Sequence, residues 1–175
     1  MSQGPITIGG IPLPSDSPVF LSVLAVHVLA GLGSVSTGII AMLSPKGPGR
    51  HPQFGTLYFR CLTVVFASMA ILSAMRWVED YHLFILGALS YTAAFLARRA
   101  VRSRSSRWVR LHISGMGLSY VLLLTAFYVD NGKNLPLWRD LPSVSYWLLP
   151  AAVGIPLILR ALSRHPLALA ERRRA

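Results

Sequence analysis

Three histidines lie in or beside long apolar stretches of the sequence: His27, His51 and His112. A neutral imidazole can ligate haem iron or a metal ion. Ionisable groups are costly inside a bilayer, so those that occur there often serve a function. A histidine can equally act as a plain hydrogen-bond partner between neighbouring helices. The sequence leaves both alternatives open, a ligand site and a helix contact.

The composition of the chain indicates a membrane protein. Its 175 residues are 53% hydrophobic and only 13% charged, whereas soluble domains usually carry about 25% charged residues. The net charge of +11 does not indicate a nucleic-acid partner, because the arginines fall between long apolar runs and not on one soluble face. Phosphate-loop, nucleophile-elbow and H-E-x-x-H motifs do not occur in the sequence. We therefore assign no catalytic residue.

Five apolar runs are long enough, or nearly so, to cross a bilayer core of about 30 Å as helices. We expect an all-α polytopic bundle with transmembrane spans at residues 18–43, 54–77, 81–97, 108–129 and 144–162, the third being the shortest. Residues 1–17 form a Gly/Pro-rich arm without Lys or Arg, so the first run is expected to be a retained helix and not a cleaved signal peptide. Residues 164–175 form a basic tail.

The charges between the spans predict an N-out, C-in orientation. The segments before the second and fourth spans are basic, with the densest cluster at Arg98–Arg110, and the tail is basic as well. The segment before the third span carries Glu79 and Asp80. Short loops rich in Lys and Arg stay cytoplasmic. We expect a multi-pass protein of the bacterial inner membrane, with anionic lipid headgroups at Arg98–Arg110 and at the tail.

Small residues recur on two of the expected spans and predict close helix contacts. On the first span the spacing i, i+4, i+7, i+11 joins His27, Gly31, Ser34 and Gly38, and on the fourth i, i+3, i+7 joins His112, Gly115 and Ser119. Both stripes are expected to face the interior of the bundle. Pro150 and Pro156 predict a bend in the fifth span.

The expected depths of the histidines decide which of them can act together. His27 lies about 13 Å from the outer boundary and His112 about 6 Å from the inner one. The resulting offset of about 11 Å disfavours a haem held between these two, although a shift of several residues in the helix boundaries would reduce it. His51 and His112 both lie near the cytoplasmic boundary, which makes them the better pair for haem iron or a metal ion.

Three stretches together resemble an uncharacterised bacterial family of small predicted membrane proteins, a domain of unknown function. They are His27 with its downstream glycines, Lys46 to Phe59 with the run His51-Pro52-Gln53-Phe54-Gly55, and Arg110-Leu111-His112 continuing to Phe127. The resemblance covers most of residues 20–160 and implies a compact helical bundle with histidines near its cytoplasmic half. It implies no reaction. The family carries a basic residue where Pro52 stands here.

Two functions from different classes are consistent with these features. The first is a polar pocket between the first, second and fourth spans, formed by His27, His51 and His112, that binds haem b, a metal ion or a quinone-like or lipid-like ligand. Tyr58 and Arg60 would then support an anionic group such as a haem propionate. The second is a non-catalytic accessory subunit that docks against partner membrane subunits. A hydrolytic zinc site fits less well, because it needs three protein ligands and the spans offer no carboxylate base.

Overall fold

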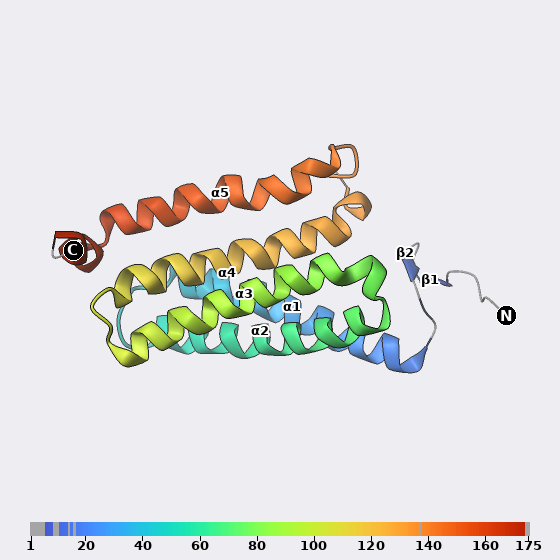
Figure 1. The fold of residues 1–175 in the computed structure, drawn as a ribbon, viewed down its shortest axis with the longest axis horizontal. Helices are drawn as coiled ribbons and strands as arrows, with labels where there is room; N and C mark the ends of the chain where they lie inside the picture. Colours follow the sequence, from blue (N-terminus) through green and yellow to red (C-terminus); the bar gives the residue numbers. More distant parts are fainter. Residues whose placement is uncertain (1–5, 9–10, 14, 16, 137, 174–175) are drawn as a thin grey trace. The chain divides into compact units, whose positions relative to one another are not determined.

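The computed structural model describes residues 6–8, 11–13, 15, 17–136 and 138–173 (Figure 1). Among these residues, five helices are long and apolar enough to cross a membrane, which confirms the expected all-helical, multi-pass fold. They are α1 (Pro18–Leu43), α2 (Arg50–Met75), α3 (Trp77–Ser103), α4 (Trp108–Asn131) and α5 (Ser143–Arg164). A short 3-10 helix, η1 (Gly132–Asn134), and a terminal helix, α6 (Pro166–Arg173), complete the helical elements.

The N-terminal arm contributes a small antiparallel hairpin that the sequence reading did not predict. Strand β1 (Ile6–Ile8) pairs with β2 (Ile11–Leu13), with Ile6 opposite Leu13. A Gly-Gly pair between β-branched residues is a known hairpin signal, and the sequence carries one at positions 9 and 10. The chain divides into two compact units, residues 1–81 and 82–175, and the division falls inside α3.

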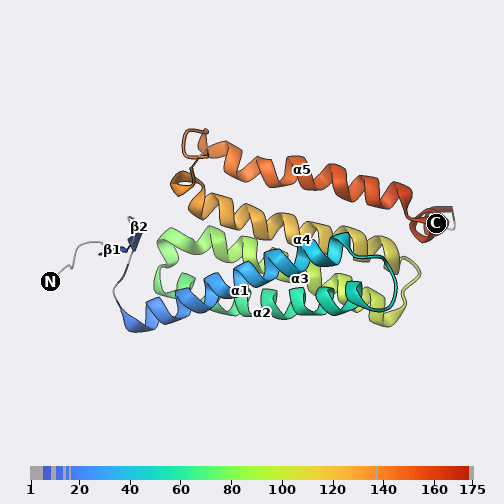
Figure 2. The same cartoon turned by 180° about the vertical axis from the view of Figure 1, so that it is seen from behind.

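In the first unit, α1 and α2 form an antiparallel helical hairpin, which Figure 2 shows from behind. Three contacts fix its register: His27 with Ser68, Gly33 with Cys61, and Ala41 with His51. The connecting loop reverses at Gly49, whose φ of 105° is a conformation that favours glycine. Ser34 and Gly38 of the predicted stripe are buried, but a side chain at Gly31 would meet no atom within 4 Å.

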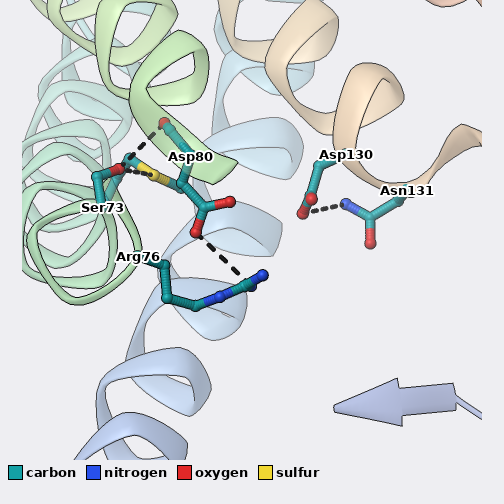
Figure 3. Close-up of polar contacts among 6 residues, drawn as sticks. Ser73, Arg76, Asp80, Asp130 and Asn131 are labelled. Atoms are coloured by element: carbon teal, nitrogen blue, oxygen red, sulfur yellow. Dashed lines mark hydrogen bonds and ion pairs between the residues drawn. The ribbon is translucent and has the colours of Figure 1, made fainter. Parts of the chain in front are cut away.

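A single residue, Arg76, separates α2 from α3. Its side chain forms an ion pair with Asp80 at 3.7 Å (Figure 3). Its carbonyl oxygen accepts hydrogen bonds from the amides of Glu79 and Asp80. The hydroxyl of buried Ser73 lies 3.4 Å from the Asp80 carbonyl oxygen. Arg76 was expected inside the second span. It belongs instead to the acidic turn, where its charge is paired.

Helix α3 extends well beyond the third predicted span, which covered residues 81–97. At 27 residues it is the longest helix of the described chain. It ends in a Schellman motif, in which the Ser105 amide donates to the Ala100 carbonyl and the Arg104 amide to the Val101 carbonyl. Arg104 takes the left-handed position with φ 46°, where glycine is usual. Charged residues continue the helix at both ends, so the helix is longer than its apolar run.

In the second unit, α3 and α4 approach closely at small residues. A Cβ added to Gly115 would lie 2.8 Å from the Ala93 carbonyl oxygen and equally close to the Ala97 side chain. Ser90 donates a hydrogen bond of 2.8 Å to the Ser119 carbonyl oxygen. Gly115 and Ser119 therefore face a neighbouring helix, as their spacing on the fourth span predicts.

Helices α4 and α5 run side by side in opposite directions (Figures 1 and 2). A Cβ at Gly154 would overlap a methyl group of Val121. At the far end, a Cβ at Gly132 would lie 2.6 Å from the ring of buried Tyr146, whose hydroxyl donates to the Trp138 carbonyl oxygen at 2.9 Å. These glycines let the two helix backbones pack at short range.

Candidate functional site

His51 occupies the second position of α2 and is oriented by the end of α1. Its Nδ1 lies 2.8 Å from the Ala41 carbonyl oxygen. Because a carbonyl oxygen can only accept, Nδ1 must carry the proton, and the lone pair of the neutral ring is on Nε2. Histidines that ligate metals are commonly oriented in this way, by donation from the other ring nitrogen to a backbone carbonyl.

The same contact also completes the C-terminus of α1. The last carbonyls of a helix have no partner within the helix. Here the Ile40 carbonyl accepts from Ser44, the Ala41 carbonyl from His51 and Lys46, and the Met42 carbonyl from Lys46 Nζ at 2.7 Å. Burial lowers the pKa of the Lys46 ammonium. His51 is thus both an oriented imidazole and a cap that ties α2 to α1.

His27 forms the second histidine contact of the hairpin. Its Nδ1 lies 2.9 Å from Ser68 Oγ. The Ser68 hydroxyl is directed at the carbonyls of its own helix, 2.7 Å from Val64 and 3.0 Å from Val65. Since the hydroxyl has one proton and donates it there, we assign the donor to His27 Nδ1–H. The His27 ring therefore also carries its lone pair on Nε2.

His27 and His51 do not converge on one centre. The 14 residues from His27 to Ala41 on α1 correspond to about 21 Å at about 1.5 Å per residue. Metal–nitrogen bonds are about 2.0–2.1 Å long, so one ion cannot bind both rings. Within the described residues, no group of three or more His, Cys, Asp or Glu side chains could hold a metal ion.

Tyr58 and Arg60, expected to support one anionic group together, lie on different faces of α2. Two residues along a helix correspond to a rotation of about 200°. Tyr58 is 2% exposed, on the same side as His51, whereas Arg60 is exposed. A group that contacts the Tyr58 hydroxyl is therefore not positioned to contact Arg60 from the same face.

The remaining histidines belong to the second unit. His112 is half-buried at the fifth position of α4. The His82 ring lies 6.2 Å from the Trp147 ring at 44°. His165, in the predicted basic tail, is half-buried at the junction of α5 and α6. The tail is thus helical and packed over part of its length.

One polar contact of the second unit was not anticipated. Both carboxylate oxygens of Glu171 accept hydrogen bonds from the first turn of α4, from the Val109 amide at 3.1 Å and the Arg110 amide at 3.2 Å. First-turn amides are unpaired within a helix, and a carboxylate there complements the helix dipole. The only signal in the sequence is a single acidic residue in an otherwise basic tail.

No known family model, curated protein or solved structure matches the chain. The fold defines the class, a multi-pass helical membrane protein. The resemblance to a family of unknown function stays a prediction from the sequence.

Proposed function

We propose that the chain is a multi-pass protein of the bacterial cytoplasmic membrane with its N-terminus outside and its C-terminus inside. Five apolar helices support membrane insertion. The alternation of basic and acidic connections supports the orientation. The turn between α2 and α3 carries a single arginine, against six between Arg98 and Arg110, which agrees with this orientation.

We further propose that the protein binds haem, with His51 as an axial ligand. The observation that carries this proposal is the hydrogen bond from His51 Nδ1 to the Ala41 carbonyl oxygen, which places the ring lone pair on Nε2. Lys46 and Arg50 stand beside His51 in the sequence and offer cationic partners for propionate groups. Haem would supply electron-transfer or ligand-binding chemistry at its iron, and the chain would hold and orient it.

The separation of the histidines favours haem over a bare metal ion. A structural zinc site takes four protein ligands and a catalytic one takes three, whereas His27 and His51 are too far apart to share an ion. A porphyrin already supplies four nitrogen ligands, so one or two axial groups from the protein suffice. A single oriented imidazole such as His51 meets that requirement.

The test is an optical spectrum of protein purified in mild detergent from haem-supplied cells. We expect a Soret band in the wild type, about one haem per chain, loss of the band in His51→Ala, and partial recovery with added imidazole. His82→Ala is the matched control, because His82 is a boundary histidine that the proposal does not use. If His51 serves only as a cap of α1, the wild type will show no Soret band.

A second candidate function, an accessory subunit, is favoured by the outer surface of α1. Gly31 belongs to the stripe of small residues, yet a side chain there would meet nothing within 4 Å. Leu29 and Leu32 beside it are exposed. A small residue between bulky ones forms a notch that suits close approach of another transmembrane helix. We propose a partner membrane helix as its occupant.

Native mass spectrometry after gentle extraction separates the two candidates. The accessory role predicts a stoichiometric complex that Gly31→Leu disrupts. Ala25→Leu introduces the same side chain on another face of α1 and should leave the complex intact. A lone monomer in the wild type, or equal effects of both substitutions, contradicts the accessory role.

A further inference from the structure

The terminal helix α6 turns away from the helix that precedes it. Helix α5 ends at Arg164, His165 is extended with φ −78° and ψ 118°, and Pro166 begins α6. Proline suits the first helical position because it lacks an amide proton that would otherwise be unpaired. Figures 1 and 2 both show α6 nearly end-on beside the end of α5, so it runs crosswise to α5.

One side of α6 is fixed to α4. Ala168 is 3% exposed, and Glu171, three residues further on the same side, accepts the two amide hydrogen bonds from α4. Val109, which supplies one of those amides, is also only 3% exposed. The docked side of α6 therefore contains its only acidic residue.

The first five residues of α6, Pro166–Ala170, are apolar, and all of them except Ala168 are exposed. Leu167 is 53% exposed and Leu169 37% exposed. Pro166 and Ala170 are exposed as well. A short helix with its acid bonded to α4 and its leucines exposed is suited to a surface that offers an apolar layer.

The position of α6 identifies that surface as the membrane itself. The helix begins one residue after α5 ends and is bonded to the first turn of α4, and both of these helices are long and apolar enough to span a bilayer. A helix at this level that runs crosswise to the spans lies in the membrane plane. Exposed arginines at the same ends of α4 and α5, Arg107 and Arg164, complement anionic headgroups.

We propose that α6 is an interfacial helix that rests on the anionic lipid surface, with Leu167 and Leu169 in the boundary between headgroups and acyl chains and Glu171 as the clamp that sets its position. The partner is the bilayer around the protein, not another polypeptide. The inference is independent of haem binding, because it uses none of the residues of the proposed haem site.

A nitroxide label at Leu167→Cys tests the position of α6. The full chain, with Cys61→Ser, is placed in nanodiscs that contain phosphatidylglycerol, and collision rates with oxygen and with a water-soluble nickel chelate are compared. We expect oxygen, which concentrates in lipid, to collide more often at residue 167, and the nickel chelate to collide more often at a Ser106→Cys control in the exposed α3–α4 loop. Equal nickel access at both positions, or protection of residue 167 from both reagents, overturns the proposal.

Two further measurements test the clamp and the choice of lipid. Glu171→Ala should reverse the order of the two collision rates at residue 167, whereas Glu79→Ala, which removes a different exposed acid, should not. Nanodiscs of phosphatidylcholine alone should lower the oxygen preference. An unchanged preference without anionic lipid contradicts the headgroup contact, and an unchanged order in Glu171→Ala contradicts the clamp. The label in the otherwise unaltered chain still tests the position if Glu171→Ala does not fold.

Discussion

At the scale of single residues, the polar side chains of the first unit act mainly on helix ends and helix contacts. His27 bonds to Ser68 and His51 bonds to the Ala41 carbonyl. The sequence identifies both histidines as unusual but not their partners, because Ser68 lies 41 residues from His27 and the register of two packed helices depends on side-chain fit. Composition and periodicity locate such residues, whereas tertiary packing decides what they contact.

The contact between His27 and Ser68 should contribute modestly to stability. Hydrogen bonds between membrane helices average about 0.6 kcal/mol and reach about 1.7 kcal/mol. A double-mutant cycle of His27→Ala and Ser68→Ala, measured by unfolding in mixed detergent, should give a coupling in that range. Pairing His27→Ala with Ser22→Ala should give none, because the Ser22 hydroxyl bonds only within its own turn. If the effects of His27→Ala and Ser68→Ala on the free energy of unfolding are fully additive, the hydrogen bond between the two residues is contradicted.

Lys46 should make the stability depend on alkaline pH. Burial lowers its pKa in the folded protein, so the folded state binds this proton less readily than the unfolded state does. The free energy of unfolding should therefore rise as the pH increases from the folded pKa toward the unfolded value of about 10.4. Lys46→Met should remove this slope, and Lys133→Met, which leaves the cap of α1 intact, should keep it. If the free energy of unfolding changes with pH in the same way in the wild type and in Lys46→Met, the prediction is contradicted.

At the scale of elements, the apolar runs predict which segments are helices better than where those helices end. The third span was expected to be the shortest, yet α3 is the longest helix, because Glu79, Asp80 and the arginines up to Arg102 extend it outside the apolar run. Arginine and glutamate are good helix formers, but they do not extend an apolar run. Helix α6 was missed for a related reason, since eight residues are too few for a periodic pattern to stand out.

Packing between α4 and α5 should depend on Gly154. A side chain there would overlap Val121, and overpacking typically costs about 1–3 kcal/mol. We expect Gly154→Ala to lower the free energy of unfolding by an amount in that range and Val121→Ala to restore part of it in the double variant. Gly31→Ala is the control, because its new methyl group meets no neighbour, and it should not lower the free energy of unfolding. Equal effects of both glycine substitutions contradict the close contact.

At the scale of the whole molecule, the number of spans and their order were predictable because the apolar runs match the thickness of a bilayer. The candidate ligand site was predictable only in part. The sequence identified His27, His51 and His112, and the structure separates the first two along one hairpin. Contacts made by backbone groups, such as the carbonyl that orients His51 and the amides that hold Glu171, carry no signature in the side-chain sequence.

The predicted threading of the chain can be tested with single cysteines in a Cys61→Ser background. Basic connections resist translocation, so Pro48→Cys and Ser106→Cys, both at exposed loop positions, should react with an impermeant maleimide only after the cells are opened. Glu79→Cys and Arg139→Cys lie in acidic or balanced connections and should react in intact cells. Reaction of Ser106→Cys in intact cells would place the arginine cluster outside and refute the N-out orientation.

The turn between α2 and α3 gives the strictest test of the predicted orientation, because it contains an arginine and is nevertheless expected outside. Arg76 is paired with Asp80, and Glu79 remains to make the turn acidic. A single arginine is a weak signal for retention in the cytoplasm beside the six between Arg98 and Arg110. Arg76→Ala should leave the labelling pattern of all four cysteines unchanged. If the labelling of any of the four cysteines changes in Arg76→Ala, the charge of this one arginine sets the side of the membrane on which the α2–α3 connection lies.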